Sequence, residues 1–458
     1  MRRLPAWIAI FCLLLQSQAW AAAGSAARRI AALEASPMPA FRIPPVVKRT
    51  LSNGVRCYFL EDHTLPLMQF QLLLPTGAIY DPADLVGLNA MTLSLLRTGG
   101  TSAHSAEAVD EALDRDAIEI DFDTGLEMSM GNLRALSQVT DRGLEWFFEI
   151  LFAPAFEPGR VALARAKAME GLRRQNDRPD AIAHREFRKL VYGRESPWAR
   201  TPTRASIRRI TTAGMRAAHA AMLSPDGLIC AAAGDIRPDT LVKQLERLFA
   251  KYPFTNAPRR TPPPAPALFR AEQRQVPRKV AQSAIMIGHR GTDRDNPDKY
   301  PLVVMDEILG STHTFTSWLT SRIRTERGLA YEVWSQYGFG PREAPGLWRI
   351  HAKTRPEATG EVVGLIKEQI DRMHDGGAVT SQDVAVMKDS IRKRMIFEYE
   401  EPFNIVTAIT RFVYLGLPED YLARYQAGIE RVTLSDVRRV AKQYLHPEAL
   451  QTLIVGNP

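Results

Sequence analysis

The residues able to bind a metal or to transfer a proton are spread thinly along this chain of 458 residues. A zinc-binding helix normally presents two histidines four positions apart on one face. No two of the nine histidines stand four apart; they occupy positions 63, 104, 184, 219, 289, 313, 351, 374 and 446. The sequence therefore holds no local two-histidine metal site. A site assembled from distant histidines is the remaining alternative.

One segment, His104-Ser-Ala-Glu107, contains half of a metal motif. Position 108, where the second histidine would stand, is alanine, and Ser105 is a typical N-cap residue for a helix. The sequence also lacks a Gly-x-Ser-x-Gly nucleophile elbow and a Gly-x-x-x-x-Gly-Lys phosphate loop. Neither a serine nucleophile nor a phosphate cradle is therefore indicated.

A helix with one buried face is predicted between Gly87 and Gly99. Leucine or methionine stands at positions 88, 91, 95 and 96, which is the i, i+3, i+4, i+7 spacing of a single helical face. The neighbouring segments give strands and helices mixed without strict alternation. Strands are predicted at Val55–Leu60, Leu67–Leu74, Ile118–Asp123, Glu127–Leu136, Ser283–Gly288, Ala330–Tyr337 and Leu347–Lys353. Helices are predicted at Ser105–Asp116, Asp141–Phe152, Pro158–Gln175, Thr211–Leu223, Asp298–Leu309 and Phe315–Glu326.

The same order of elements is predicted twice along the chain. A Leu-x-Pro turn at Leu223 leads through an apolar strand to Gly234, and a second turn at Leu445 leads through an apolar strand to Gly456. The offset is 222 residues at both anchors, which indicates an internal duplication. The prolines at 262, 263, 264 and 266 cannot form a helix or a central strand.

These observations predict an α+β fold with two homologous halves, each a β-sheet covered by helices. We expect the first half over residues 45–255, a proline-rich linker over 256–278, and the second half over 279–458.

The N-terminus has the features of a secretory signal peptide. Arg2 and Arg3 precede an apolar run from Ala6 to Leu15, and Ala19-Trp-Ala21 fits an Ala-x-Ala cleavage site. The run is too short to cross a bilayer. We therefore expect residues 1–21 to be removed and the protein to be exported, most simply to the periplasm, without a membrane anchor.

The formal net charge is +8, and the basic and acidic residues are interspersed along the chain. No cluster that combines basic and aromatic residues, as nucleic-acid-binding segments do, stands out. A solvated surface is favoured over nucleic-acid binding. Cys57 and Cys230 each lie in an apolar, strand-like run. Buried thiols are the preferred interpretation, and a disulfide stays open if the two strands are neighbours in an oxidising compartment.

The helix at Gly87–Gly99, the duplication and the segment Arg322–Tyr337 together resemble the insulinase/pitrilysin family of zinc peptidases, from about Leu51 to the end of the chain. Softer markers in the same order are Asn53-Gly54-Val55, Tyr192-Gly193, Gly234-Asp235 and Asp420-Tyr421-Leu422. The resemblance is to the short bacterial subunits of two halves. It implies a duplicated pitrilysin-like metallopeptidase fold in which two chains enclose a peptide-sized cavity.

The family's zinc helix reads Gly-Leu-Ala-His-x-x-Glu-His, and this chain departs from it at each chemical position. Ala90 and Ser94 replace the histidines, and Leu93 replaces the general base. The resemblance places Glu170 at or beside the family's third ligand, although an ordinary surface glutamate is the preferred interpretation. A single carboxylate cannot hold zinc where three protein ligands are needed. We therefore expect no metal or other cofactor on this chain.

The resemblance also identifies Arg324 and Tyr331, which stand in an Arg-x-x-x-x-Leu-x-Tyr frame. It implies that the arginine binds a substrate carbonyl and that the tyrosine hydroxyl stabilises the developing oxyanion. Arg327 is an adjacent alternative for the carbonyl contact.

Three functions follow from the resemblance. The first is a non-catalytic, substrate-binding subunit of an exported heterodimeric zinc endopeptidase. In that case an insulinase-family partner would hold the zinc, and this chain would supply Arg324 and Tyr331 to its active site. The second is a periplasmic protein that binds peptides, or serves as a scaffold, with no role in hydrolysis. The third, a zinc endopeptidase in its own right, needs a metal site that the sequence does not contain.

Overall fold

The structure is a computed structural model that describes residues 42–252, 254, 260–266, 269–311 and 313–457. The predicted signal peptide at 1–21 lies outside the described residues, as does part of the predicted linker. Residues 43–458 form one compact unit. Among the described residues, no helix combines the length and the apolar character needed to cross a membrane.

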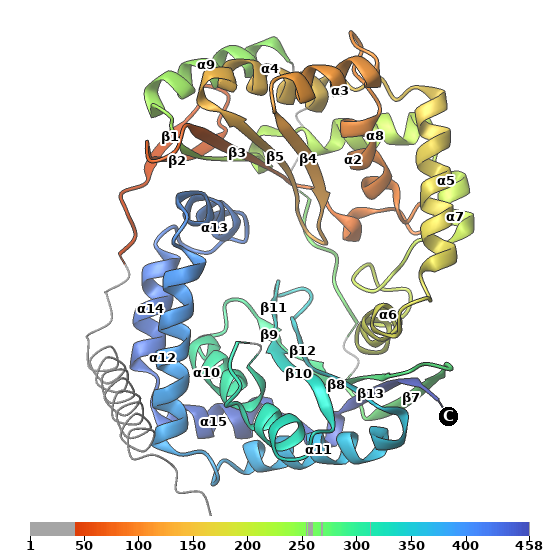
Figure 1. The fold of residues 1–458 in the computed structure, drawn as a ribbon, viewed down its shortest axis with the longest axis vertical. Coiled ribbons are helices and arrows are strands. Elements are labelled where there is room, and N and C mark those ends of the chain that lie inside the picture. Colours follow the sequence, from red (N-terminus) through yellow and green to blue (C-terminus); the bar gives the residue numbers. More distant parts are fainter. Residues whose placement is uncertain (1–41, 253, 255–259, 267–268, 312, 458) are drawn as a thin grey trace, which may run out of the picture. The chain divides into compact units, whose positions relative to one another are not determined.

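The first half is built on a six-stranded sheet with the order β1-β2-β6-β3-β5-β4 (Figure 1). Its strands are β1 (Val47–Thr50), β2 (Arg56–Glu61), β3 (Leu67–Leu74), β4 (Glu119–Thr124), β5 (Ser129–Leu136) and β6 (Ile229–Gly234). The helices of this half are α2 (Leu88–Thr98), α3 (Ala106–Arg115), α4 (Thr140–Phe152), α5 (Pro158–Arg174), α6 (Pro179–Tyr192), α7 (Arg204–Arg209), α8 (Thr212–Met222) and α9 (Pro238–Lys251). Most of them bury an apolar face on one side of the sheet. There the rings of Phe70 and Phe147 pack edge to face, with their centres 5.3 Å apart.

The second half contains a five-stranded sheet with the order β10-β12-β8-β13-β7. Its strands are β7 (Glu272–Pro277), β8 (Ser283–Arg290), β10 (Ala330–Tyr337), β12 (Leu347–Thr354) and β13 (Gln451–Gly456), and a short parallel pair is formed by β9 (Thr292–Asp293) and β11 (Phe339–Gly340). The helices are α10 (Lys299–Gly310), α11 (Thr359–Asp375), α12 (Ser381–Glu398), α13 (Pro402–Tyr414), α14 (Tyr421–Arg431) and α15 (Leu434–Tyr444).

The two sheets share one strand order, which confirms the predicted fold of two homologous halves. Strands β2, β6, β3, β5 and β4 of the first sheet correspond in sequence order and position to β7, β13, β8, β12 and β10 of the second. In both, the last strand along the chain, β6 or β13, runs parallel to the first and antiparallel to the second of these strands. Strand β7 lies inside the range expected to be linker. Strand β7 consists mostly of charged and polar residues and ends in proline, so it lacks the apolar alternation that usually marks a strand. This composition is tolerated because β7 lies at the edge of the sheet.

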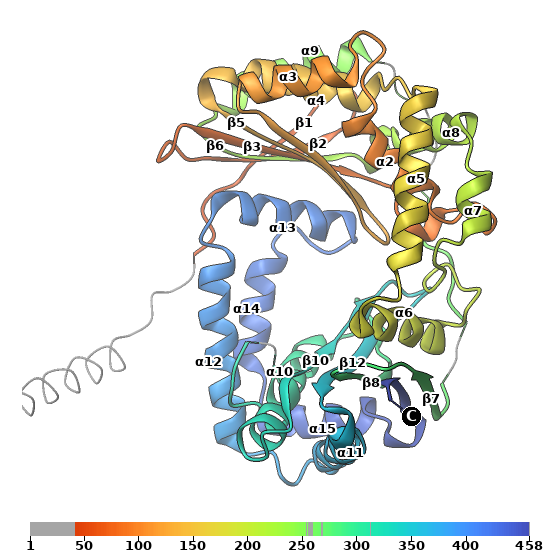
Figure 2. The same cartoon turned by 45° about the vertical axis from the view of Figure 1, so that its right-hand side comes forward.

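Each half supplies one helix to the sheet of the other half. Helix α13 of the second half lies against β2 and β6 of the first sheet (Figure 2), where Ile409 belongs to one apolar cluster with Tyr58 and Ile229. Helix α6 of the first half lies against β8 and β13 of the second sheet, where Phe187 belongs to one cluster with Leu453. Because α6 and α13 occupy equivalent places in the two halves, the exchange is reciprocal.

Glu127 adds a polar connection between the halves. Arg294 Nη2 lies 2.9 Å and 3.1 Å from the two carboxylate oxygens of Glu127, and both side chains are largely buried. The Tyr414 hydroxyl, from α13, donates to the backbone oxygen of Glu127 at 2.9 Å. Removing one member of such a buried pair would leave an uncompensated charge, which typically costs about 3–5 kcal/mol.

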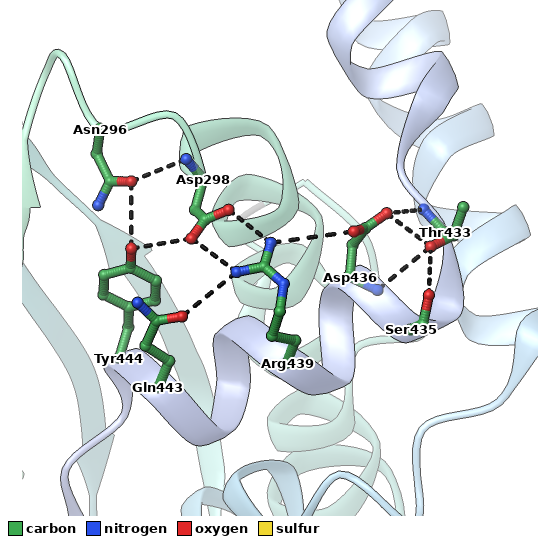
Figure 3. Close-up of polar contacts among 8 residues, drawn as sticks. All are labelled: Asn296, Asp298, Thr433, Ser435, Asp436, Arg439, Gln443 and Tyr444. Atoms are coloured by element: carbon green, nitrogen blue, oxygen red, sulfur yellow. Dashed lines mark hydrogen bonds and ion pairs between the residues drawn. The ribbon is translucent and has the colours of Figure 1, made fainter.

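The start of α10 is fixed by a network from α15 (Figure 3). Arg439 donates to both carboxylate oxygens of Asp298, at 2.8 Å and 2.5 Å, and the Tyr444 hydroxyl donates to the same carboxylate at 2.9 Å. The hydrogen bond from Arg439 holds the pKa of Asp298 below its usual value. Thr433 and Asp436 form a capping box at the start of α15. This network fixes α10 relative to α15.

Cys57 and Cys230 lie directly opposite each other in the parallel pair β2–β6. Both are buried free thiols in the first core, and burial raises the pKa of Cys230. The sequence could not tell whether the strands are neighbours; the register shows that they are.

The docking of α6 on the second sheet can be tested with Phe187→Ala. Phe187 is fully buried, so its truncation should lower the free energy of unfolding by about 3–5 kcal/mol. Phe397→Ala is the matched control, because this side chain of α12 is 74% exposed and its loss should change stability by less than about 0.5 kcal/mol. Urea unfolding of both variants measures the difference. Equal stability of the two variants would mean that α6 does not dock as described.

Candidate functional site

Arg324 and Tyr331 lie together in the structure. The guanidinium carbon of Arg324 is 4.8 Å from the centre of the Tyr331 ring and 4.6 Å from the centre of the Phe315 ring. Tyr331 is 80% exposed and Phe315 is 69% exposed. Within the described part of the chain, no carboxylate forms an ion pair with Arg324. The site is therefore a partly exposed guanidinium in contact with two aromatic rings, and its N–H donors have no acidic partner.

Tyr331 points away from the sheet because it is the extra residue of a β-bulge. Strand β10 is an edge strand paired with β12; Ala330 lies opposite Thr354 and Glu332 lies opposite Lys353, so that Tyr331 has no partner across the ladder. Bulges at sheet edges change the direction of a side chain. Here the bulge places the phenol in solvent beside Arg324.

Strand β10 is tied to α10 by the buried carboxylate of Asp306. Asp306 accepts hydrogen bonds from the Ser335 hydroxyl at 2.7 Å, from the backbone N–H of Tyr337 at 2.9 Å and from Trp348 Nε1 at 3.1 Å. Burial raises the pKa of Asp306 to about 7, and the three donors offset part of that rise. These bonds fix the second half of β10, so the bulge at its start has a defined position.

Arg324 belongs to a π-helical segment, Thr320–Thr325, within the region predicted to be a helix at Phe315–Glu326. The backbone N–H of Glu326 donates to the oxygen of Ser321, five residues earlier, at 2.9 Å. Wider turns of this kind occur often at functional sites. The hydrophobic periodicity of the sequence could not distinguish a π-helix from an α-helix here. Leu319 and Ile323, four positions apart, are buried in the structure and would share one face in either kind of helix.

The alternative residue Arg327 has a different partner. Its Nη1 donates to Glu361 Oε1 on α11 at 3.1 Å, and no ring contact with Tyr331 is formed. The structure thus brings Arg324, not Arg327, to Tyr331.

Helix α2 is the helix that the sequence resemblance aligns with a zinc-binding helix, and its start is well defined. Asp81 caps its start: the backbone N–H of Gly87 donates to Asp81 Oδ2 at 2.7 Å, and the backbone N–H of Asn89 donates to Oδ1 at 2.9 Å. Burial raises the pKa of Asp81, and these donors oppose the rise. Gly87 has φ of 105°, a left-handed conformation that favours glycine.

A groove of about 400 Å³ lies between α2 and α5. Ala90 and Ser94 line it from α2, and Lys167 and Ala168 line it from α5. Leu93 does not line it; this side chain is fully buried in the first core. The groove thus offers a methyl group, a hydroxyl and an ammonium group. Its carboxylate, Asp110 on α3, is engaged in an ion pair with Arg97. A zinc site needs imidazole and carboxylate ligands.

Glu170 follows Lys167 and Ala168 in the sequence of α5, but it does not line the groove. Its carboxylate accepts hydrogen bonds from Arg173 Nη1 at 3.1 Å and Arg174 Nε at 2.8 Å, and these bonds lower its pKa. Nowhere in the described ranges do three His, Cys, Asp or Glu side chains gather in a way that could hold a metal ion. The residues present therefore do not fit zinc.

Comparison with known proteins agrees with this geometry. The family model described as "Peptidase M16 inactive domain" matches residues 209–391. An uncharacterised zinc protease of Streptomyces coelicolor is 23% identical over 88% of this chain and 88% of its own length. YmxG of Helicobacter pylori, described as a non-peptidase homolog, is 21% identical over 87% of this chain and 90% of its own. These matches make the chain similar to inactive members of the insulinase/pitrilysin family.

Solved structures share the fold of this pitrilysin-type chain. A peptidase M16 inactive domain from Pseudomonas fluorescens superimposes with a TM-score of 0.80 at 23% identity, over 91% of this chain and 98% of its own. A protease from Helicobacter pylori gives a TM-score of 0.79 at 17% identity, over 90% and 100%. The periplasmic protease PqqL of Escherichia coli gives 0.76 at 15% identity, over 92% of this chain and 47% of PqqL. The inactive-domain match and the description of the YmxG relative support a chain without peptidase activity of its own.

Phe315 is the member of the site that sequence reasoning missed. It was expected inside a helix, where a phenylalanine is normally a core residue. The only signal was its closeness to Arg324, nine positions away in the chain.

The groove between α2 and α5 can be tested by rebuilding the metal site. Ala90→His with Ser94→His places two imidazoles on the groove, but Glu170 is held by arginines outside it. We expect this double variant to bind zinc weakly, and the addition of Lys167→Glu to tighten binding, because a carboxylate on α5 then replaces an ammonium group in the groove. Zinc titration measures both. Glu170→Gln in the double variant is the control, and loss of its residual zinc binding would show that Glu170 is a ligand after all.

Proposed function

We propose that this chain is the non-catalytic, substrate-binding subunit of an exported, heterodimeric zinc endopeptidase. An insulinase-family partner holds the zinc, and this chain supplies Arg324 and Tyr331 to the partner's active site. The substrate is a peptide or an unfolded polypeptide. Arg324 binds a backbone carbonyl, and the Tyr331 hydroxyl donates a hydrogen bond to the oxyanion.

The observation that carries this proposal is the contact between Arg324 and the exposed Tyr331 ring, on a chain whose counterpart of the zinc helix has no ligands. A hydroxyl held by a β-bulge and a guanidinium without an acidic partner are available donors. Preorganised donors of this kind stabilise a developing oxyanion by about 2.7–4 kcal/mol each. They have no use in a chain that only supports an assembly.

Two comparisons support parts of the proposal. The name of the YmxG relative, a non-peptidase homolog, agrees with a chain that does not hydrolyse peptides by itself. The solved structure of PqqL is that of a periplasmic protease, which agrees with export of a protein of this fold.

A peptide-binding protein with no role in hydrolysis is the second candidate. The exposed Phe315 and Tyr331 rings favour it, because they could hold a peptide without a partner. Co-expression with a His-x-x-Glu-His relative, followed by size-exclusion chromatography and zinc analysis, separates the two candidates. An equimolar complex with zinc and peptidase activity supports the heterodimer; separate peaks at every salt concentration support the binding protein.

Tyr331→Phe tests the oxyanion donor. The exposed ring is kept and one hydrogen bond is lost, so kcat of the assembled complex should fall roughly 100- to 1,000-fold while the complex and its zinc remain intact. Tyr337→Phe removes a hydroxyl from the other end of β10 and should change kcat little. Unchanged peptide hydrolysis by the Tyr331→Phe complex would refute the proposed role.

The variants Arg324→Ala and Arg327→Ala together test which arginine binds the substrate carbonyl. Because Arg324 lies against Tyr331, its loss should raise KM and lower kcat, since the contact exists in the ground state and in the transition state. Arg327 is paired with Glu361, so its loss should alter either constant less than about threefold, as for an exposed ion pair. The reverse order of effects would assign the contact to Arg327.

A further inference from the structure

Phe315 lies against the same guanidinium as Tyr331. Its ring centre is 4.6 Å from the guanidinium carbon of Arg324, slightly closer than the ring of Tyr331. Because both contacts are made to rings, Arg324 is held in place without a carboxylate. Its hydrogen-bond donors therefore remain available to an incoming group.

The two rings are also exposed to solvent. Phe315 is 69% exposed and Tyr331 is 80% exposed. Single exposed apolar side chains are common, but these two flank one cation. Phenylalanine, tyrosine and arginine together resemble the composition at the centre of protein–protein contacts, where aromatic residues and arginine are enriched.

We infer that Phe315 is a specificity-determining residue that forms an apolar subsite for a large apolar side chain of the peptide, next to the carbonyl bound by Arg324. This inference rests on the proposed function. An acidic side chain could pair with Arg324 but would gain nothing from the two rings. When a peptide carbonyl accepts a hydrogen bond from Arg324, an apolar side chain next to that carbonyl can pack against the Phe315 ring at the same time.

The test uses the assembled complex and pairs of peptides that differ only by Leu or Phe against Ala at each position near the cleaved bond. At one position, the unmodified complex should prefer the large apolar residue by about 10- to 100-fold in kcat/KM. In Phe315→Ala this preference should fall below about threefold. Phe315→Trp should keep the preference. Phe397→Ala, an equally exposed phenylalanine on α12, should also keep it.

The failure of this inference and that of the proposed function are distinguishable. If Tyr331→Phe lowers kcat for every peptide but Phe315→Ala affects all peptides equally or none, the apolar subsite is refuted and the proposed function stands. If the complex does not hydrolyse peptides, the apolar subsite is tested by measuring the affinity of this chain alone for the same labelled peptide pairs. Loss of the preference in Phe315→Ala supports the subsite, and an unchanged preference refutes it.

Discussion

The reciprocal exchange of α6 and α13 is the constraint on which the rest of the structure depends. Each sheet is apolar on both faces, so each needs two covering layers. The helices of each half cover one face only. The other face of the first sheet, with Tyr58 and Ile229, is covered by α13, and that of the second sheet, with Leu453, is covered by α6. Neither half can therefore bury its own sheet completely.

This dependence explains why a half without metal chemistry is retained. Removal of the first half would expose the face of the second sheet that α6 covers, together with the charge of Arg294 that Glu127 neutralises. The second sheet carries the bulge at Tyr331, and its edge strand is held by Asp306. The position of the candidate site thus depends indirectly on packing supplied by the half whose zinc helix has lost its ligands.

Much of the fold could be predicted, because hydrophobic periodicity indicates the helices and strands and the internal repeat indicates the two halves. The duplication was visible at Leu223 and Leu445, where a turn and a buried strand repeat without insertions. The exchange could not be predicted, since an amphipathic helix such as α6 does not reveal which sheet it covers. The candidate site was found only through its frame of Arg324 and Tyr331. The bulge is a one-residue change of register, and Phe315 lies in a bend before the helical segment that contains Arg324; neither leaves a periodic signal.

Leu93 shows how the loss of metal chemistry is linked to stability. In the family pattern this position holds a glutamate, whose charge is tolerable beside a metal-bound water. In this chain the side chain at 93 is fully buried in the first core, and no metal ligand faces it from α2. A carboxylate there would be an unpaired buried charge, which is far more costly than a buried leucine. If the resemblance aligns these positions correctly, Ala90 and Ser94 leave no ligands on α2, and Leu93 is a core residue. The scaffold of α2, capped by Asp81, then serves packing alone.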